Sequence, residues 1–333
     1  MSGPAREPDA AASARAGGKV ILLGEHAVVH GVPAIAAGIG LGATARARAL
    51  PPGEASVLEL GGRSWRAGGT EDTARAFTAL LAAGAPMNGE RDAQTEEAAV
   101  EVVAHSDLPA GGGLGSSAAL GVAIAKAVEL LLRGVADPDR ALCRARAWEE
   151  VFHGTPSGID TAAALHGGCF RFSRAHGVHP ITPARALWLC VGWTGAGAST
   201  KAMVDSVAQL AARKPELVSR AMDGIRALVQ NAELCIEGGD LPALGKLMNM
   251  NQMILAGLMV STEGIETLCA AARGAGALGA KLTGAGGGGS VIALLSGEDA
   301  APAVLDAWKA AGFAGFVTSI EDGPRPAGEE RAR

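Results

Sequence analysis

Residues 109–120 read PAGGGLGSSAAL: a proline and four glycines lead into two serines and a run of helix-forming residues. A glycine cluster costs backbone entropy, and the usual reason for one is that something must approach the main chain closely. The residues that follow, 116–134, predict a helix that ends at a glycine. Free backbone N–H groups and the helix dipole at its start favour a bound anion. A glycine-rich turn that only lets a strand and a helix pack closely explains these residues equally well.

Two named phosphate-binding motifs fit this loop poorly. The nucleotide P-loop requires GxxxxGK[ST], and neither GK pair of the chain, at 18–19 and 245–246, is followed by Ser or Thr. The dinucleotide fingerprint GxGxxG/A matches at 113–118. However, this loop does not follow its strand directly, and the region where the ribose-binding acid should lie is still predicted helix. Glycine makes up 48 of the 333 residues, so short glycine patterns need support from their surroundings.

Composition and charge argue against nucleic-acid and membrane partners. Aromatic residues make up only 3% of the chain and the formal net charge is -5, whereas nucleic-acid binders often stack aromatic residues on a basic surface. No stretch approaches the 18 consecutive apolar residues of a membrane-spanning helix. The five cysteines are scattered, without a CxxC pair, which is typical of small buried side chains in a reducing compartment. We therefore expect a cytoplasmic protein.

Predicted strands and helices are mixed in both halves of the chain, which favours an α+β fold with two lobes. Strands are predicted at 19–24 and 41–50, four helices at 200–212, 215–237, 240–258 and 262–275, and a strand, a glycine turn and a strand within 276–295. The expected organisation is a disordered N-terminal tail of residues 1–17, an N-terminal domain of residues 18–180, a C-terminal domain of residues 181–321 and a charged tail of residues 322–333.

Two carboxylates stand out in residues 149–161, EEVFHGTPSGIDT. Glu149 lies near the end of a predicted helix, and Asp160 is predicted in a loop behind Pro156 and Gly158. Beside bound phosphates, one carboxylate can bind Mg²⁺, which prefers oxygen ligands, and the other can accept the proton of an attacking hydroxyl. Taken alone, each acid has a simpler explanation, Glu149 as a solvated helix residue and Asp160 as a turn or cap residue.

Four segments share the order and the spacing of the signature segments of a known superfamily. They are KVILLGEHAVVHGVPAIAAGI (19–39), LPAGGGLGSSAAL (108–120), HGTPSGID (153–160) and GALGAKLTGAGGGGSVIALL (276–295). With these segments the chain resembles the superfamily of galactokinase, homoserine kinase, mevalonate kinase and phosphomevalonate kinase, the GHMP kinases. GEHAVVHG and HGTPSGID are most similar to the mevalonate kinase branch. The resemblance spans residues 18–295, which is nearly the whole chain.

The resemblance implies a two-lobed GHMP-kinase fold with the active site in the cleft between the lobes. It also implies ATP and Mg²⁺ as cofactors and the phosphorylation of a small molecule, mevalonate, on its primary hydroxyl, a step of isoprenoid biosynthesis. A homodimer remains an open alternative to a monomer. The implied site residues are Asp160 as catalytic base with Lys19 beside it; Gly111, Gly112, Gly113, Leu114, Gly115, Ser116 and Ser117 around the ATP phosphates; Ser117 and Glu149 on magnesium; and Glu25, His26, Thr200, Gly284 and Ala285 around the acceptor.

Other functions remain open at this point. Within the superfamily, the alternatives are a phosphomevalonate kinase, a kinase that acts on another hydroxyl of mevalonate, and a decarboxylase of the same fold. Outside catalysis, the alternative is a ligand-binding homologue. The joint presence of Lys19, Ser117, Glu149 and Asp160 favours an active enzyme, and SGID with an upstream glutamate favours a kinase over a decarboxylase. The family commonly has Asn where this chain has Thr155 and Thr161, so the loop around the base differs in detail.

Overall fold

Two long strands organise the N-terminal half of the chain. The computed structural model describes residues 11–83, 99–109, 111–154 and 156–321. In it, β1 (Ala11–Leu23) and β2 (Ala34–Ala49) pair antiparallel over nearly their whole length. The other edge of β2 pairs with β5 (Val100–Ser106) at one end and with β6 (Cys169–Ser173) at the other. The seven-stranded sheet is completed by β3 (Val57–Leu60), β4 (Arg63–Arg66) and β7 (Gly177–Ile181).

The start of β1 corrects the predicted N-terminal tail. Residues 11–17 are not disordered but pair with residues 42–48 of β2, and Ala14 and Ala16 are buried. The alternation of small and polar residues in this stretch, AASARAG, matches the similar alternation in ARARA of β2, so the two segments share one buried face. The first ten residues of the predicted tail, and residues 322–333 of the predicted charged tail, lie outside the described residues.

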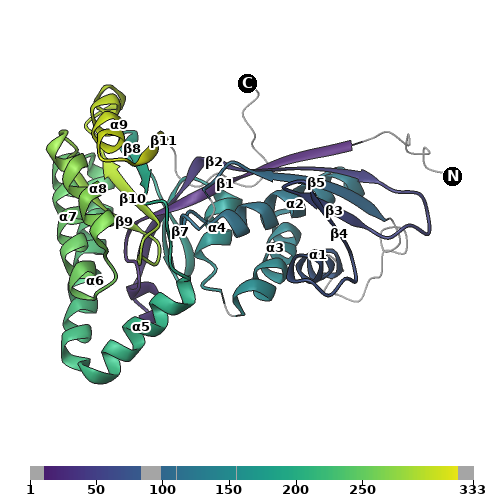
Figure 1. Cartoon of the computed structure of the whole chain (residues 1–333), viewed down its shortest axis with the longest axis horizontal. Coiled ribbons are helices and arrows are strands. Elements are labelled where there is room, and N and C mark those ends of the chain that lie inside the picture. The colour runs from purple at the N-terminus through teal and green to yellow at the C-terminus, as the bar shows by residue number, and fades with distance from the viewer. Residues whose placement is uncertain (1–10, 84–98, 110, 155, 322–333) are drawn as a thin grey trace.

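The helices of the N-terminal half lie on one side of this sheet (Figure 1). Helix α2 (Ser116–Arg133) packs on β1 and β2, α3 (Pro138–His153) packs on α2, and α1 (Asp72–Ala82) packs on α3. Arg144 of α3 joins these three helices, because its Nε donates to Glu129 of α2 at 2.6 Å and its Nη1 donates to the carbonyls of Leu80 and Leu81 in α1. The short helix α4 (Ile159–His166) contacts β1, α2 and α3.

The C-terminal half forms a second, four-stranded antiparallel sheet. Its order is β11-β8-β10-β9, made of β8 (Leu187–Trp193), β9 (Gly279–Thr283), β10 (Ser290–Leu294) and β11 (Ala314–Ile320). Helices α8 (Glu263–Gly274), α7 (Leu241–Gly257) and α9 (Ala301–Ala310) pack on this sheet, while α6 (Pro215–Gly238) packs on α7 and α5 (Thr200–Arg213) packs on α6. The four predicted helices between 200 and 275 are confirmed as α5 to α8, each within a few residues of its expected ends.

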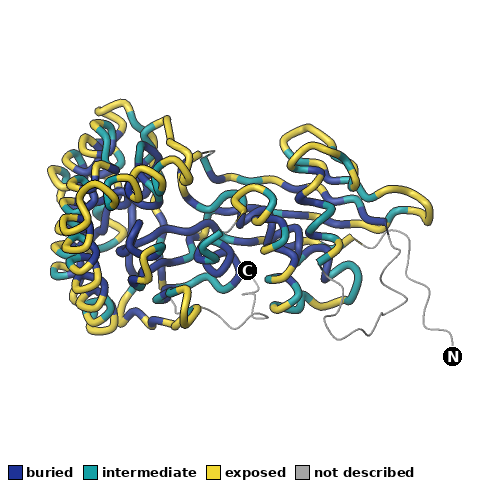
Figure 2. The backbone as a smooth tube through the Cα atoms, turned by 90° about the horizontal axis from the view of Figure 1, so that it is seen from below, coloured by how far each residue is buried: buried dark blue, intermediate teal, exposed yellow. Residues whose placement is uncertain are grey.

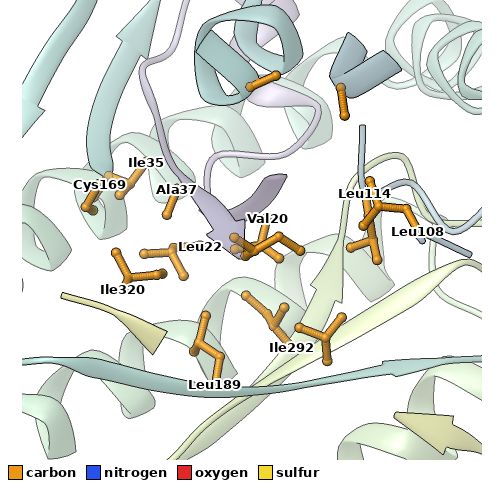
Figure 3. Close-up of a cluster of buried hydrophobic side chains, with 14 of the residues drawn as sticks. Val20, Leu22, Ile35, Ala37, Leu108, Leu114, Cys169, Leu189, Ile292 and Ile320 are labelled. Atoms are coloured by element: carbon orange, nitrogen blue, oxygen red, sulfur yellow. The ribbon is translucent and has the colours of Figure 1, made fainter. Parts of the chain in front are cut away.

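An apolar interface joins the two sheets. Figure 3 shows Val20 and Leu22 of β1 pointing toward Leu189 of β8 and Ile292 of β10. These four side chains are at most 1% exposed. Figure 2 shows burial along the whole backbone. Buried residues run through the middle of the molecule, and exposed residues lie on the outer turns of the C-terminal helices. β1 is therefore part of the core of both halves, and the residues that follow it lie at their junction.

No helix within the described ranges combines the length and hydropathy needed to cross a bilayer.

Candidate active site

The glycine loop leads directly into helix α2. Gly111, Gly113 and Gly115 all have positive φ angles, between 70° and 74°, a region that costs other residues steric strain. Gly115 is the N-cap of α2 and has no side chain to satisfy the first N–H groups of the helix. The loop and the helix start thus combine free backbone donors with the positive end of the helix dipole, as an anion site requires.

Two other glycine-bearing segments pack against this loop. A Cβ atom added at Gly284 would lie 3.1 Å from the Gly113 carbonyl oxygen, and one added at Gly197 would lie 2.3 Å from that of Gly111. The Gly289 N–H donates to the carbonyl of Ala196 at 2.6 Å. Main chains from three parts of the sequence therefore meet here without intervening side chains. Gly284, predicted from the resemblance, lies at this junction.

Lys19 and Asp160 form an ion pair beside the same loop. Their Nζ and Oδ1 atoms are 3.1 Å apart, and the lysine also donates to the Gly113 carbonyl at 3.0 Å. The Lys19 side chain is 5% exposed, whereas that of Asp160 is 39% exposed. Gly115 allows this approach, because a Cβ there would lie 3.1 Å from Cγ of Lys19. The carboxylate is accessible from solvent while its cationic partner is buried.

The structure corrects the predicted setting of Asp160. It is the second residue of α4, whose N-cap is Gly158, and does not lie in a loop. Pro156 and Gly158 mark the turn correctly, but the helix that follows has only eight residues and is buried on most sides, so it lacks the 3.6-residue periodicity by which longer helices are recognised. Thr161, the next residue, is buried, and Thr155 lies outside the described residues.

Ser117 and Glu149 meet on the other side of the helix start. The Ser117 hydroxyl donates to Oε1 of Glu149 at 2.5 Å, and His153 lies 3.9 Å from Oε2 one turn along α3. Burial raises the pKa of the Glu149 carboxyl, and the bond from Ser117 and the neighbouring His153 oppose this shift. The repulsion from Asp160 adds to the increase, so the two carboxylates lie within electrostatic reach of each other.

Glu25 and His26 follow β1, and their side chains bind the C-terminal half. The Glu25 carboxylate forms an ion pair with Lys281 of β9 and accepts a hydrogen bond from Nδ2 of Asn251 in α7 at 3.1 Å. His26 Nε2 lies 2.7 Å from the Ala285 carbonyl oxygen, so this nitrogen carries the proton and Nδ1 is an acceptor. Within the described residues, the buried Nδ1 has no hydrogen-bond partner.

Among the described residues, no hydrogen bond or ion pair joins the Thr200 side chain to the other predicted site residues. It is exposed at the start of α5, where the side chain of Ser199 rather than Thr200 accepts a hydrogen bond from the helix backbone. The preceding segment, 196–199, nevertheless packs on the last glycine loop, since a Cβ at Gly287 would lie 2.7 Å from Cβ of Ala198. The segment before Thr200 therefore packs against the glycine loop, whereas Thr200 itself is exposed.

Lys281 and Asn251 are site neighbours that the sequence did not reveal. Lys281 is a single lysine within an otherwise apolar strand and is fully buried, and Asn251 is one of several amides in α7. Their common partner, Glu25, is 256 and 226 residues away in the chain. No local pattern could have joined them, although a lysine inside an apolar strand is itself an indication of a buried partner.

No group of three or more His, Cys, Asp or Glu residues with the geometry of a metal site occurs among the described residues. A magnesium ion that also binds substrate phosphates needs only one or two protein oxygens, so the Ser117 and Glu149 pair remains a reasonable set of donors.

Comparisons with known proteins match the two halves of the chain to the two domain models of one family. Residues 75–168 match the model of the GHMP kinases N-terminal domain, and residues 225–314 match that of the GHMP kinases C-terminal domain. Mevalonate kinase of Pyrococcus horikoshii is 35% identical over 321 residues, covering 92% of this chain and 95% of that protein. Mevalonate kinase of Methanothermobacter thermautotrophicus is 34% identical over 301 residues, covering 90% and 95%. The crystal structure of L. major mevalonate kinase in complex with R-mevalonate has a TM-score of 0.81 at 30% identity, covering 97% of this chain and 99% of that one.

Proposed function

Because the chain belongs to the GHMP kinase family, we propose that it transfers the γ-phosphoryl group of ATP to the primary hydroxyl of (R)-mevalonate. The observation that carries this proposal is the ion pair of Lys19 and Asp160 at the glycine loop, with an accessible carboxylate beside backbone donors for phosphate. The similarity to mevalonate kinases over more than nine-tenths of the chain supports the same substrate.

The transfer breaks the bond between the γ-phosphorus and the oxygen that remains with ADP, and forms a bond to the hydroxyl oxygen of mevalonate. The transition state is loose, so positioning and charge neutralisation matter most. Asp160 accepts the hydroxyl proton. Lys19 holds Asp160 in place and offsets negative charge that develops on the transferred group. The N–H groups of residues 111–117 bind the phosphates of ATP, except that of Gly112, which donates to the Pro109 carbonyl at 3.1 Å.

Ser117 and Glu149 are the residues that we expect to hold magnesium. The Ser117 hydroxyl and Oε1 of Glu149 are 2.5 Å apart, and among the described residues the basic side chain paired with the buried Glu149 is His153, 3.9 Å from Oε2. Hard oxygen donors of this kind suit Mg²⁺, which also binds substrate phosphates. When bound, the ion neutralises phosphate charge during transfer.

The acceptor pocket would include His26, Gly284 and Ala285, with the buried Glu25 behind His26 and the exposed Thr200 at the edge. The unpartnered Nδ1 of His26 is an acceptor that a substrate hydroxyl can satisfy. Two lysines near this pocket, Lys19 and Lys281, are each paired with a carboxylate. Lys201, next to Thr200, is exposed. A single carboxylate is easier to match with this set of basic residues than a phosphate, which favours mevalonate over phosphomevalonate as the acceptor.

An acceptor panel tests this function. Mevalonate, phosphomevalonate, homoserine and galactose are each supplied with ATP and magnesium, and products are identified by mass and phosphorus NMR. We expect kcat/KM for mevalonate to exceed that for phosphomevalonate by about 10²-fold, if an unpaired phosphate charge costs about 3 kcal/mol. Faster use of phosphomevalonate, or phosphorylation of the tertiary hydroxyl, would assign the chain to another branch of the family. Absence of ADP release with every acceptor would favour a ligand-binding homologue.

A cytoplasmic location and a homodimer are further parts of the proposal. All five cysteines are free, as is common in a reducing compartment. The homodimer stays a prediction, for which sedimentation equilibrium is the measurement.

A further inference from the structure

Glu25 is fully occupied by partners from the C-terminal half. One of its oxygens pairs with Nζ of Lys281 and the other accepts from Asn251, and the side chains of Glu25 and Lys281 are both 0% exposed. Burial raises the pKa of Glu25 and lowers that of Lys281, while the attraction between the two opposes both shifts. Because the Glu25 side chain is 0% exposed and each of its oxygens already faces a partner, a substrate could contact it only if this buried cluster opened, so Glu25 is poorly suited to bind it directly.

The residue after Glu25 has an unusual backbone conformation. His26 has a φ angle of 60° and a ψ angle of -40°, and only one other non-glycine residue of the described chain has a positive φ. Such a conformation costs about 1–3 kcal/mol and persists only where the surroundings fix it. Here Glu25, the residue before His26, is held by Lys281 and Asn251. His26 itself is held by the hydrogen bond between its ring and the Ala285 carbonyl.

The backbone that carries Lys281 is itself fixed by α7. β9 is an edge strand of its sheet, so one row of its N–H groups faces away from β10. Two of these groups are satisfied by side-chain amides of α7. The Ala280 N–H donates to Oδ1 of Asn249 at 3.0 Å, and the Leu282 N–H donates to Oε1 of Gln252 at 2.9 Å. The residues on both sides of Lys281 are therefore anchored to the helix that also supplies Asn251.

We propose that Lys281 and Asn251 are positioning residues of the acceptor site, which act through Glu25 to hold the turn that presents His26. The role in acceptor binding rests on the function proposed above. The positioning itself is a property of the ligand-free protein. This arrangement joins the two halves of the chain. The turn at Glu25 and His26 follows β1, whereas the partners named here that hold it all come from residues 251–285.

The protein offers a matched control for a purely structural ion pair. Arg144 and Glu129 are also buried, at 5% and 0% side-chain exposure, and they also join separate elements. Their partners lie in α1, α2 and α3, and neither residue contacts a predicted site residue. Replacing Arg144 removes the nearer of two arginines that face Glu129, the other being Arg133 at 3.5 Å. Replacing Lys281 removes the ion-pair partner of Glu25. Both substitutions weaken a buried ion pair, so both should lower the thermal midpoint.

Steady-state kinetics then separate positioning from stability. We expect Lys281→Met to raise the KM for mevalonate by about 10-fold or more and to change the KM for ATP by less than about twofold, at a temperature where the variant is folded. Arg144→Met should leave both constants unchanged. The double variant Lys281→Met/Glu25→Gln should be no worse than its single variants, because the two residues act as a unit. Equal changes in both KM values, no change, or additive effects would overturn the proposal. If Lys281→Met does not fold, Asn251→Leu, which leaves the ion pair intact, gives the same comparison.

A spectroscopic measurement needs no substrate. Protein labelled with ¹⁵N-histidine, with the His26 signals assigned by comparison with His26→Asn, should show His26 as a single tautomer protonated at Nε2. In Lys281→Met the His26 ring should populate both neutral tautomers, whereas in Arg144→Met it should remain protonated at Nε2 alone. An unchanged His26 spectrum in Lys281→Met would overturn the proposal even if mevalonate is phosphorylated. If the acceptor panel fails instead, the spectrum still decides whether Lys281 positions His26.

Discussion

Asp160 and Glu149 carry the same functional group in different surroundings, and their surroundings suit different tasks. Asp160 is 39% exposed and pairs with a buried lysine, so a hydroxyl can reach it while the lysine holds it in place. Glu149 is 3% exposed in its side chain and accepts from a serine at the start of a helix. An accessible carboxylate suits proton transfer, and a buried one beside a hydroxyl suits a metal ion.

Exchange of each acid for its amide tests this division. Asp160→Asn should lower kcat by at least about 10²-fold while nucleotide still binds, because Asn keeps the shape but cannot take a proton. Glu149→Gln should instead raise the magnesium concentration needed for half-maximal rate, since a neutral amide is a weaker ligand for a hard cation. Magnesium titration at saturating ATP and calorimetric nucleotide binding are the two measurements. Near-normal turnover of Asp160→Asn, or an unmoved magnesium curve for Glu149→Gln, would contradict the respective role.

At the scale of elements, the sequence predicts well those segments whose signals are local. The helices α5, α7 and α8 begin at a capping side chain, Ser199, Asp240 and Thr262, and all three were expected near their observed bounds. The elements that were not predicted depend on distant partners. The hairpin of β3 and β4 is short and attached to β5, and the first part of β1 is a strand only because β2 lies beside it. The same holds for Lys281 and Asn251, whose place in the site follows from the fold alone.

The first part of β1 allows a test at this scale. Removal of residues 1–17 deletes the seven residues that pair with 42–48 of β2. With about 0.2–1 kcal/mol for each cross-strand pair, we expect a loss of about 2 kcal/mol. For a chain of this length that corresponds to a decrease of about 3 °C in Tm. Calorimetry should show this decrease relative to a protein shortened by residues 1–10 only, with kcat unchanged. Identical melting curves for the two shortened proteins would mean that this part of β1 adds no stability.

At the scale of the whole molecule, the site also affects the pH dependence of folding. Burial lowers the pKa of His26, while its bond to the Ala285 carbonyl opposes the shift. The unfolded chain therefore takes up a proton at this residue near its ordinary pKa of about 6.5, and the folded protein does so only at lower pH. Between these two values the unfolded state binds more protons, so the free energy of unfolding falls as the pH falls.

His26→Asn should remove this contribution, and Asn tolerates a positive φ better than most residues. We expect the wild-type protein to lose more stability than the variant as the pH falls from about 7.5 to about 5.5, by up to about 1.4 kcal/mol per pH unit below the ordinary pKa. Urea unfolding at each pH measures the difference. Other groups, such as Glu149 with its raised pKa, contribute to both proteins and cancel. Parallel curves for the two proteins would show that His26 titrates normally.

The ion pair between Glu25 and Lys281 also determines when, during synthesis of the chain, the turn at His26 can be completed. A ribosome makes Glu25 early and Lys281 256 residues later, an interval of roughly 13–50 s at about 5–20 residues per second. During that interval the strained turn has neither its cationic partner nor the Ala285 carbonyl, so the first half of a nascent chain cannot yet form the acceptor site. The sheet of the N-terminal half can form while synthesis continues, because its strands all come from residues 11–181. On the acceptor site proposed above, a chain released before residues 281–285 are made would therefore hold the sheet of its N-terminal half but lack the partners of Glu25 and His26.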